Sequence, residues 1–297
     1  MILVTGGTGF IGQILVSHLV TLGYPVRLLL NPSRDYPKLP KGISVEVTIS
    51  SMNDERNLRA SMKDIDTVFH LVGTEWKGIH AEFEEVDIRA ARMFSKVAGA
   101  MGVQRFIYLS HIGADRASAY NLLRAKAIAE AAIRESGVPF TIVRSGIVYG
   151  QNDHFTTTLR DFILKTRGPL LIPGGDPTLI QPIWVEDLIT TLMLCMDDES
   201  TLNTTVFAGG IETFTFRQCL ELVMQTIHKK KRIIPIQASL LRRLYIANEQ
   251  WFPGRIPMYF WLDYMAEDRI TALDILPREF GLMPTRMTQN ISYLRDD

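Results

Sequence analysis

The sequence has few cysteines, no excess of charge of either sign and no broad basic segment. Its two cysteines, Cys195 and Cys219, both fall in apolar helical patterns and lack the spacing of metal ligands. We therefore expect no disulfide framework and no metal site, and we expect a reducing compartment. Lysine plus arginine (32) equals aspartate plus glutamate (32), and this balance argues against nucleic acid as a partner.

Signals for membrane insertion or export are also missing from the pattern. No apolar run reaches the roughly 18 residues that a membrane-spanning helix needs. The strand pattern begins at Met1, where a signal peptide would have a charged region followed by an apolar one. With 46% hydrophobic and 22% charged residues, we expect a soluble globular protein of the cytoplasm.

The first 150 residues alternate short apolar strands with helical patterns. This alternation predicts an α/β fold, a Rossmann-type doubly wound parallel sheet with helices on both faces. Strands are expected at Met1–Thr5, Val26–Leu30, Ile43–Ile49, Asp66–Val72, Arg105–Ser110 and Phe140–Arg144, and helices at about Ile11–Leu22, Leu58–Met62, Val86–Val97 and Ala119–Glu135.

After Gly150 the composition changes, because prolines and glycines cluster and aromatic residues become denser. We expect residues 1–150 to form a dinucleotide-binding domain. Residues 151–297 are expected to form a smaller C-terminal lobe for a substrate or partner, with some segments returning to the sheet. Two helices are predicted in this part, Val185–Met196 and Phe216–His228.

A glycine-rich turn follows the first predicted strand and opens the first helix. Residues Thr5–Gly12 read T-G-G-T-G-F-I-G. Gly7, Gly9 and Gly12 fit the dinucleotide fingerprint, and Gly6, Gly9 and Gly12 fit its short-chain-dehydrogenase variant. Such glycines allow a tight turn, a close approach of the backbone to a pyrophosphate and close helix–strand packing. The helix N-terminus adds unpaired N–H groups and a positive dipole end, so we expect a bound dinucleotide.

The end of the second strand indicates which dinucleotide. Sites selective for NAD place an acid there to hold the ribose 2′-hydroxyl, but no acid occurs before Asp35. Asn31, Ser33 and Arg34 are suited to a 2′-phosphate, with Arg34 supplying the positive charge. NADP(H) is therefore favoured over NAD(H), although Arg34 also fits a solvated loop.

The order of these landmarks resembles the extended and atypical short-chain dehydrogenase/reductases. Within that superfamily the chain looks most like the branch that contains the 39 kDa accessory subunit of respiratory complex I and its bacterial relatives. Besides the turn, the matching segments are Asp66–Gly73, Tyr108–Ser110, Ala125–Lys126 with Glu130, Arg144–Gly150 and Gln181–Asp187.

The resemblance implies a role for individual positions. The residues expected at the cofactor are Gly6, Thr8, Gly9, Phe10, Ile11 and Gly12 at the pyrophosphate, Leu71, Val72 and Gly73 at the adenosine half, Ser110 beneath the nicotinamide ribose, Lys126 at its hydroxyls, and Ser145, Ile147 and Val148 at the carboxamide.

The chain departs from the family where the adenine and the substrate would be held. Members often carry an acid after the third strand to hold the adenine amine, and Ser51 stands there. In the family, the serine that holds the substrate oxygen usually follows the first serine at the end of the fifth strand, and His111 and Ile112 occupy those positions here. His111 is a candidate acid or base because a histidine titrates near neutrality, and it also fits a surface or capping position. His70 lies on a buried strand and is interpreted as a packed core histidine.

The tyrosine–lysine pair of active members is also disrupted. The tyrosine that acts as general acid or base should lie four residues before Lys126, but Leu122 occupies that position. Tyr120 lies six residues before Lys126, about 120 degrees around a helix, unless the helix starts after it and lets it reach inward. If Tyr120 is the motif tyrosine, Arg124 replaces the lysine, and arginine does not titrate in the required range.

Basic and aromatic residues gather in residues 228–262. His228–Arg232 is expected to close a helix, where cations suit the dipole. Leu240–Tyr245 and the aromatic residues that follow combine apolar and basic side chains. This pattern fits the core or substrate lid of a lobe, and also a surface that contacts a protein partner or rests on a membrane.

Two functional hypotheses follow. The first is an accessory or assembly protein of a redox complex that holds NAD(P)(H), peripheral to a membrane complex, in which bound cofactor stabilises the fold. The alternative is an active NADP-dependent reductase, epimerase or isomerase acting on a small molecule, with Tyr120, His111 and Lys126 as candidate catalytic residues. Hydride transfer is the cofactor's chemistry, so a missing tyrosine does not by itself exclude turnover.

Overall fold

The computed structural model describes residues 1–32, 42–52, 54–74, 81–175, 177–251, 262 and 264–295. The chain divides into two compact units. The first, called the sheet unit below, comprises Met1–Thr74, Glu82–Ser145 and Leu188–Phe207, and the second unit consists mainly of Gly146–Asp187 and Ala208–Asp297.

A seven-stranded sheet forms the centre of the sheet unit. Its strands are Ile2–Thr5 (β1), Val26–Leu30 (β2), Glu46–Ile49 (β3), Thr67–His70 (β4), Arg105–His111 (β5), Phe140–Ser145 (β6) and Thr204–Ala208 (β10). They lie in the order β3–β2–β1–β4–β5–β6–β10. β1 pairs in parallel with both β2 and β4, so that Thr5 lies beside Leu29 and His70. This order and direction are those of the doubly wound dinucleotide-binding fold, and the predicted fold class is confirmed.

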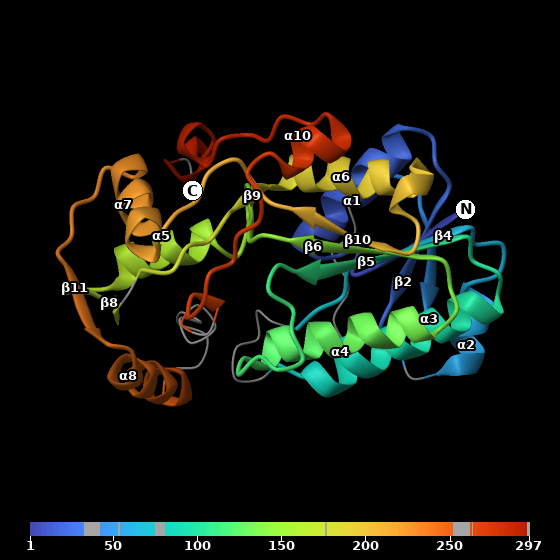
Figure 1. Cartoon of the computed structure of the whole chain (residues 1–297), viewed down its shortest axis with the longest axis horizontal. Helices are drawn as coiled ribbons and strands as arrows, with labels where there is room; N and C mark the ends of the chain where they lie inside the picture. The colour runs from blue at the N-terminus through green and yellow to red at the C-terminus, as the bar shows by residue number, and fades with distance from the viewer. Residues whose placement is uncertain are drawn as a thin grey trace. The chain divides into compact units, whose positions relative to one another are not determined.

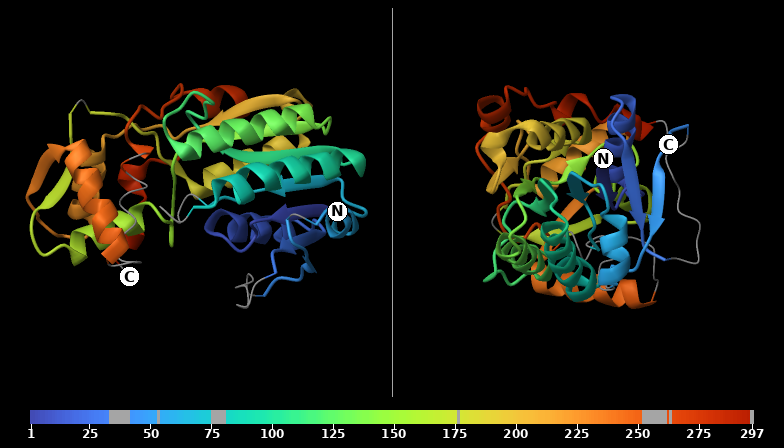
Figure 2. Two further views of the ribbon diagram at one scale, coloured as in Figure 1. Left: turned by 90° about the horizontal axis from the view of Figure 1, so that it is seen from below. Right: turned by 90° about the vertical axis from the view of Figure 1, so that its right-hand side faces the viewer.

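Helices cover both faces of this sheet. Figure 1 shows α3 and α4 on one side and α1 and α6 on the other, and the views of Figure 2 show α3 and α4 side by side. The helices are Phe10–Thr21 (α1), Glu55–Ser61 (α2), Ala90–Ala100 (α3), Asn121–Glu135 (α4) and Val185–Asp197 (α6). Central strands enclosed in this way are apolar along their whole length, and all four residues of β1 are buried.

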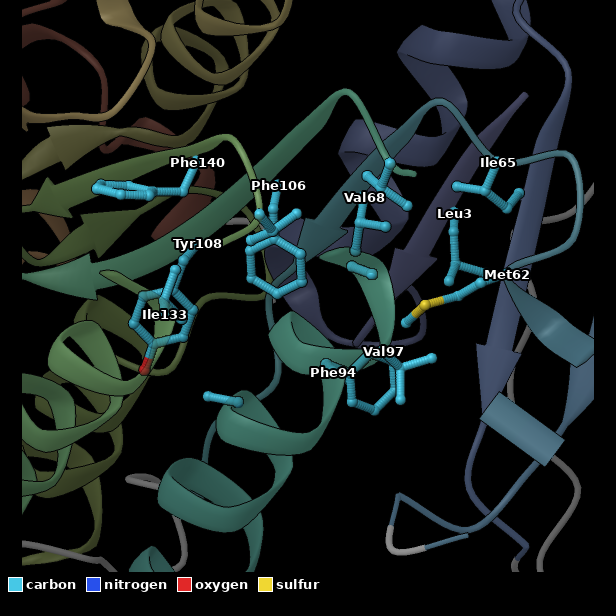
Figure 3. Packing of buried hydrophobic residues seen from close by; sticks show 14 of the residues in the cluster. Leu3, Met62, Ile65, Val68, Phe94, Val97, Phe106, Tyr108, Ile133 and Phe140 are labelled. Carbon is cyan, nitrogen blue, oxygen red and sulfur yellow. The ribbon is translucent and has the colours of Figure 1, made fainter. Parts of the chain in front are cut away.

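The hydrophobic core of the sheet unit lies between the sheet and α3 with α4. Figure 3 shows Val68 and Phe106 from neighbouring strands facing Phe94 and Val97 of α3. These side chains are fully buried. The helix begins with a π-helical turn, Phe83–Arg89. A π turn shifts the side chains that precede it around the helix axis, and such turns are frequent at functional sites.

The second unit is built from shorter elements. α5 packs against α7, and α8 packs against the two-stranded sheet of β8 and β11. The unit contains Val148–Tyr149 (β7), Thr156–Lys165 (α5), Leu170–Gly174 (β8), Ile183–Trp184 (β9), Phe216–Thr226 (α7), Ile233–Gln237 (β11), Ala238–Trp251 (α8) and Ile275–Phe280 (α10).

The structure corrects the expectation for the basic run at 228–232. α7 ends at Thr226, two residues before the predicted end, and His228 has a positive φ of 53°. The backbone N–H of Lys229 donates to the carbonyl of Met224 at 2.9 Å. The basic run therefore lies between α7 and β11 rather than on the last helical turn.

Candidate cofactor-binding site

The glycine turn is held in one conformation by contacts that only glycine allows. Gly6 has a φ of +73°, and a Cβ there would lie 2.9 Å from the carbonyl carbon of Leu71. A Cβ on Gly12 would lie 2.2 Å from the carbonyl oxygen of Gly6. The N–H of Gly9 donates to that same oxygen at 3.0 Å and closes the turn. The turn, the start of α1 and the end of β4 are thus packed backbone to backbone.

The first turn of α1 has the features of an anion site. Gly9 precedes the helix in an extended conformation and provides no side-chain cap, and the first turn contains no acidic residue. The side chain of Gln13 is turned away to the carbonyl of Thr8, to which its Nε2 donates at 2.7 Å. Gly9 is exposed, and Phe10 and Ile11 are half-buried. Helix N–H groups without a capping side chain are the donors that a pyrophosphate accepts from.

The residues predicted at the adenosine half follow neighbouring strands. Leu71 directly follows β4, and its N–H donates to the carbonyl of Thr5 at 3.2 Å. Val72 comes next and is half-buried, and Gly73 after it is exposed. The backbone of Leu71 and Val72 lies beside Gly6, which is consistent with the predicted role.

Asn31 and Ser51 are exposed and follow β2 and β3. The N–H of Ser50 donates to the carbonyl of Leu30 at 3.0 Å, which brings these two strand ends together. Ser33 and Arg34, also predicted to bind the cofactor, lie outside the described residues.

Lys126 forms a buried ion pair that the sequence did not reveal. Its Nζ lies 3.1 Å from Oδ1 of Asp87, and the side chains are 2% and 0% exposed. Oγ1 of Thr74 donates to Oδ2 of Asp87 at 2.8 Å. The ammonium also lies 5.4 Å from the centroid of the Tyr108 ring. Lys126 is therefore neutralised by a protein carboxylate from the π-helical turn.

The position of Asp87 offers a signal that the sequence reading missed. It lies four residues before Ala91 and seven before Phe94, on the face of the helix that packs into the core. A carboxylate at helical spacing with core residues requires a buried partner. Its spacing from Ala91 and Phe94 is thus the signal in the sequence that points to Asp87.

His70 is a core residue, as predicted. It is fully buried, its Nδ1 lies 2.8 Å from Oγ1 of Thr5, and its ring lies 5.0 Å from that of Phe94. Burial, and then the charge of Lys126, lower the pKa of His70 to about 3. The imidazole is therefore neutral at physiological pH.

Ser110 and Ser145 lie at the ends of β5 and β6 and are both buried. Oγ of Ser110 donates to Oε1 of Glu130 at 2.6 Å, and Arg144 holds the same carboxylate with two hydrogen bonds of 2.9 and 2.7 Å. Oγ of Ser145 donates weakly to the carbonyl of Ser110 at 3.4 Å. The strand ends beneath the predicted nicotinamide position are thus rigidly bonded.

Ile147 and Val148 belong to the second unit. The carbonyl of Ile147 accepts a hydrogen bond from the N–H of Ile183 at 2.8 Å, and Val148 pairs with Ile183 between β7 and β9. Their predicted contact with the carboxamide remains a prediction.

Tyr120 lies outside helix α4, and this corrects one step of the sequence argument. The helix starts at Asn121 rather than Ala119, and Tyr120 precedes it with an extended backbone (φ −97°, ψ 123°). The angle of about 120 degrees to Lys126 assumed that both residues were helical, so it does not apply.

Leu122, in the position of the family tyrosine, is buried, and Arg124 is exposed with its Nη2 donating to Asn121. His111 is the last residue of β5 and is half-buried. The roles of Tyr120 and His111 as acid or base remain predictions.

None of the helices in the described ranges is long and apolar enough to cross a bilayer. Within those ranges there is also no group of three or more His, Cys, Asp or Glu residues arranged to hold a metal ion.

Comparison with known proteins places this geometry in context. A family model described as NAD(P)H-binding matches residues 6–162. The chain is 30% identical over 271 residues to the mitochondrial NADH dehydrogenase (ubiquinone) 1 alpha subcomplex subunit 9 of Arabidopsis thaliana, covering 88% of this chain and 67% of that protein. It is 25% identical over 306 residues to the Mus musculus protein of the same name, covering 98% and 79%. Both are subunits of mitochondrial NADH dehydrogenase, so the predicted resemblance to the complex I branch is confirmed.

Among solved structures, the fold is similar to that of the Citrobacter sp. triphenylmethane reductase complexed with NADP(H). The TM-score is 0.75 at 18% identity, and the match covers 100% of this chain and 99% of the reductase. At this identity the likeness concerns the fold alone.

Proposed function

Because this chain belongs to the NAD(P)H-binding family and, within it, to the group that contains subunit 9 of mitochondrial NADH dehydrogenase, we propose that it is an accessory or assembly protein of a redox complex. In this role the dinucleotide is a structural ligand. A ligand that binds only the folded state stabilises that state, and above its Kd the stabilisation grows with the logarithm of the ligand concentration.

One observation carries the proposal. The glycine turn has the close backbone contacts that the dinucleotide fingerprint requires. In contrast, Lys126, the lysine of the proton relay, is paired with Asp87, and the position of the family tyrosine is occupied by the buried Leu122. A lysine lowers the pKa of a neighbouring tyrosine through its unneutralised charge. Pairing with a carboxylate cancels most of that effect, so the arrangement supports binding more than acid–base catalysis.

The accessory role is supported if NADPH raises the melting temperature of the whole chain while reduced cofactor is not consumed. We expect an increase of about 5–10 °C near saturation, since a ligand at 100 times its Kd adds about 2.7 kcal/mol. The measurement is thermal unfolding with and without NADPH, followed by absorbance at 340 nm during incubation with carbonyl compounds. Steady oxidation of NADPH that depends on Tyr120 or His111 would favour the alternative of an active reductase.

We further propose that the site prefers NADP(H) to NAD(H). The support is the absence of an acid directly after β2, where Asn31 is exposed and the preceding Leu30 accepts a hydrogen bond from Ser50. Replacing Asn31 by aspartate should weaken NADPH about tenfold relative to NADH, because the carboxylate repels a 2′-phosphate and accepts from a 2′-hydroxyl. Fluorescence titration of both reduced cofactors measures this. Tighter binding of NADH by the unsubstituted chain contradicts the preference.

The finer proposal for a partner concerns the outer face of α8. Leu240 and Leu244 are 50% and 47% exposed, and Arg243 lies on the same helical face. Lys229, Lys230 and Arg232 are exposed before β11 in the same unit. Exposed leucines beside basic residues suit a contact with a membrane-associated complex. The aromatic residues at 252–261 that contributed to this prediction lie outside the described residues.

Replacing both Leu240 and Leu244 by glutamate should lower the fraction recovered with native membranes about tenfold or more, since each buried leucine contributes about 1.5–3 kcal/mol. The matched control is Leu164→Glu, because Leu164 is 44% exposed on α5 of the same unit. The fraction is measured by sedimentation and immunoblotting. Recovery of the unsubstituted chain only in the supernatant contradicts the proposal.

A further inference from the structure

Arg269 is a buried cation of the second unit. Its side chain is 2% exposed, although Asp268 and Ile270 on either side are exposed. The Arg269 side chain therefore points into the unit, away from the surface that its two neighbours face. Burying a charged group that lacks full pairing costs several kcal/mol, so the environment of this side chain needs an explanation.

Among the described residues, only the Nη1 amino group of the guanidinium has hydrogen-bond partners. Nη1 donates to Oε2 of Glu267 at 3.1 Å and more weakly to the carbonyl of Asp268 at 3.4 Å. Nε and Nη2 are buried, and across the part of the chain that the structure describes neither has a hydrogen-bond partner. These two nitrogens form one edge of the planar group, with two parallel N–H bonds, and that edge matches the two oxygens of a carboxylate or phosphate.

Two other arginines of this chain show what that edge binds when it is filled. In Arg27, Nη1 donates to the carbonyls of Ser61 and Lys63, while Nε and Nη2 hold the two carboxylate oxygens of Glu46 at 2.8 and 3.1 Å. In Arg144, Nε and Nη2 hold the two oxygens of Glu130. Arg269 also donates through Nη1, to Glu267 and the carbonyl of Asp268, but among the described residues no acid holds its Nε–Nη2 edge.

The backbone around Arg269 is fixed in place. The N–H of Arg269 donates to the carbonyl of Leu179 at 2.7 Å, and Ile180 is bridged to Arg269 on one side and to Phe214 on the other. Oε1 of Gln181 accepts from the N–H of Thr271 at 2.7 Å. The guanidinium is thus carried by a backbone segment that is fixed by hydrogen bonds. A planar guanidinium held in place in this way loses little entropy when it binds a ligand.

We propose that the Nε–Nη2 edge of Arg269 binds an oxyanion, the carboxylate or phosphate group of a small-molecule ligand. The ligand supplies the two oxygens that Glu46 and Glu130 supply to the other arginines. The site lies in the second unit, which contains Arg269, whereas the glycine turn belongs to the sheet unit. It gives the second unit a ligand-binding role of its own.

The test measures the melting temperature of the full chain in sodium acetate, sodium phosphate and sodium chloride at matched ionic strength. The unsubstituted chain should melt about 2–4 °C higher in at least one oxyanion than in chloride. This is the shift expected when the oxyanion concentration is about ten times its Kd. The oxyanion with the larger effect assigns the class. Arg269→Met should lose this increment and melt at or above the unsubstituted chain in chloride, because a buried and partly unpaired cation has been removed.

Two further variants keep the result interpretable. Arg278→Met is the matched control, because Arg278 is 57% exposed in the same unit and should retain the full increment. Arg269→Lys keeps the charge without the fork and should lose most of the increment, and it serves if the methionine variant does not fold. The proposal is overturned if neither oxyanion stabilises the unsubstituted chain beyond chloride. It is also overturned if the Arg269 variants keep the increment, as they would if phosphate acted only at the glycine turn.

Discussion

Replacing Gly12 by alanine is expected to abolish the stabilisation of the chain by NADPH. The new Cβ would lie 2.2 Å from the carbonyl oxygen of Gly6 and 2.7 Å from the Cα of Gly7. Both neighbours are backbone atoms, so the strain cannot be relieved by a rotamer change and costs about 1–3 kcal/mol or more. The turn must open to relieve it, and opening moves the N-terminal N–H groups of α1 away from the pyrophosphate.

The measurement is the NADPH-dependent shift in melting temperature, together with direct titration of the cofactor. Gly168→Ala is the control, because a Cβ at Gly168 meets nothing within 4 Å and its φ is not positive. Gly9→Ala separates binding from folding. Gly9 is exposed, and its Cβ would be 3.3 Å from the Gly6 carbonyl, so this variant should fold and bind more weakly. An unchanged NADPH titration of a folded Gly12→Ala chain would place the cofactor elsewhere.

The parts of the fold that the sequence predicted are those set by local pattern. β2 has the predicted bounds, Val26–Leu30, and β1 differs from the prediction by one residue. Strands buried on both faces are continuous apolar runs, and that signal does not depend on tertiary contacts. The glycine turn was equally visible, because a positive φ and a backbone contact both require glycine.

Features that depend on tertiary contacts were not predicted. The pairing of Asp87 with Lys126 joins segments far apart in sequence, and Asp87 lies in the π-helical turn Phe83–Arg89. The sequence predicts Tyr120 inside a helix because no strong start signal separates Ala119 from Asn121. In the second unit, β7 and β9 have two residues each, too few to carry a periodic pattern.

Removing either member of the Asp87–Lys126 pair is expected to destabilise the sheet unit by about 3–5 kcal/mol, since the remaining charge is left buried and unpaired. Asp87→Asn preserves an acceptor for Thr74 while removing the negative charge, and Lys126→Met preserves the volume of the stem. The double substitution should cost less than the sum of the two single ones by about 2 kcal/mol or more, because it leaves no buried charge. Urea unfolding of the three variants measures the coupling.

A matched control for this cycle is the pair of Lys96 and Glu55, whose closest atoms are 3.9 Å apart and whose side chains are 66% and 39% exposed. Exposed pairs contribute little, about 0–1 kcal/mol, so Lys96→Met should leave the unfolding free energy nearly unchanged. If Asp87→Asn costs no more than Lys96→Met, the buried pair does not contribute as inferred.

The double variant also tests the role that the family resemblance assigns to Lys126. If Asp87 holds the ammonium in the cofactor-bound chain as it does here, the double variant should bind NADPH within about threefold of the unsubstituted chain, a difference below 1 kcal/mol. If Lys126 instead bonds the ribose hydroxyls, binding should weaken by about 1.5–3 kcal/mol, as for the loss of a charged hydrogen bond. Asp87→Asn would then release the lysine and leave NADPH binding unchanged or tighter. Comparing the two variants in one titration therefore separates a lysine that stabilises the fold from one that holds the cofactor.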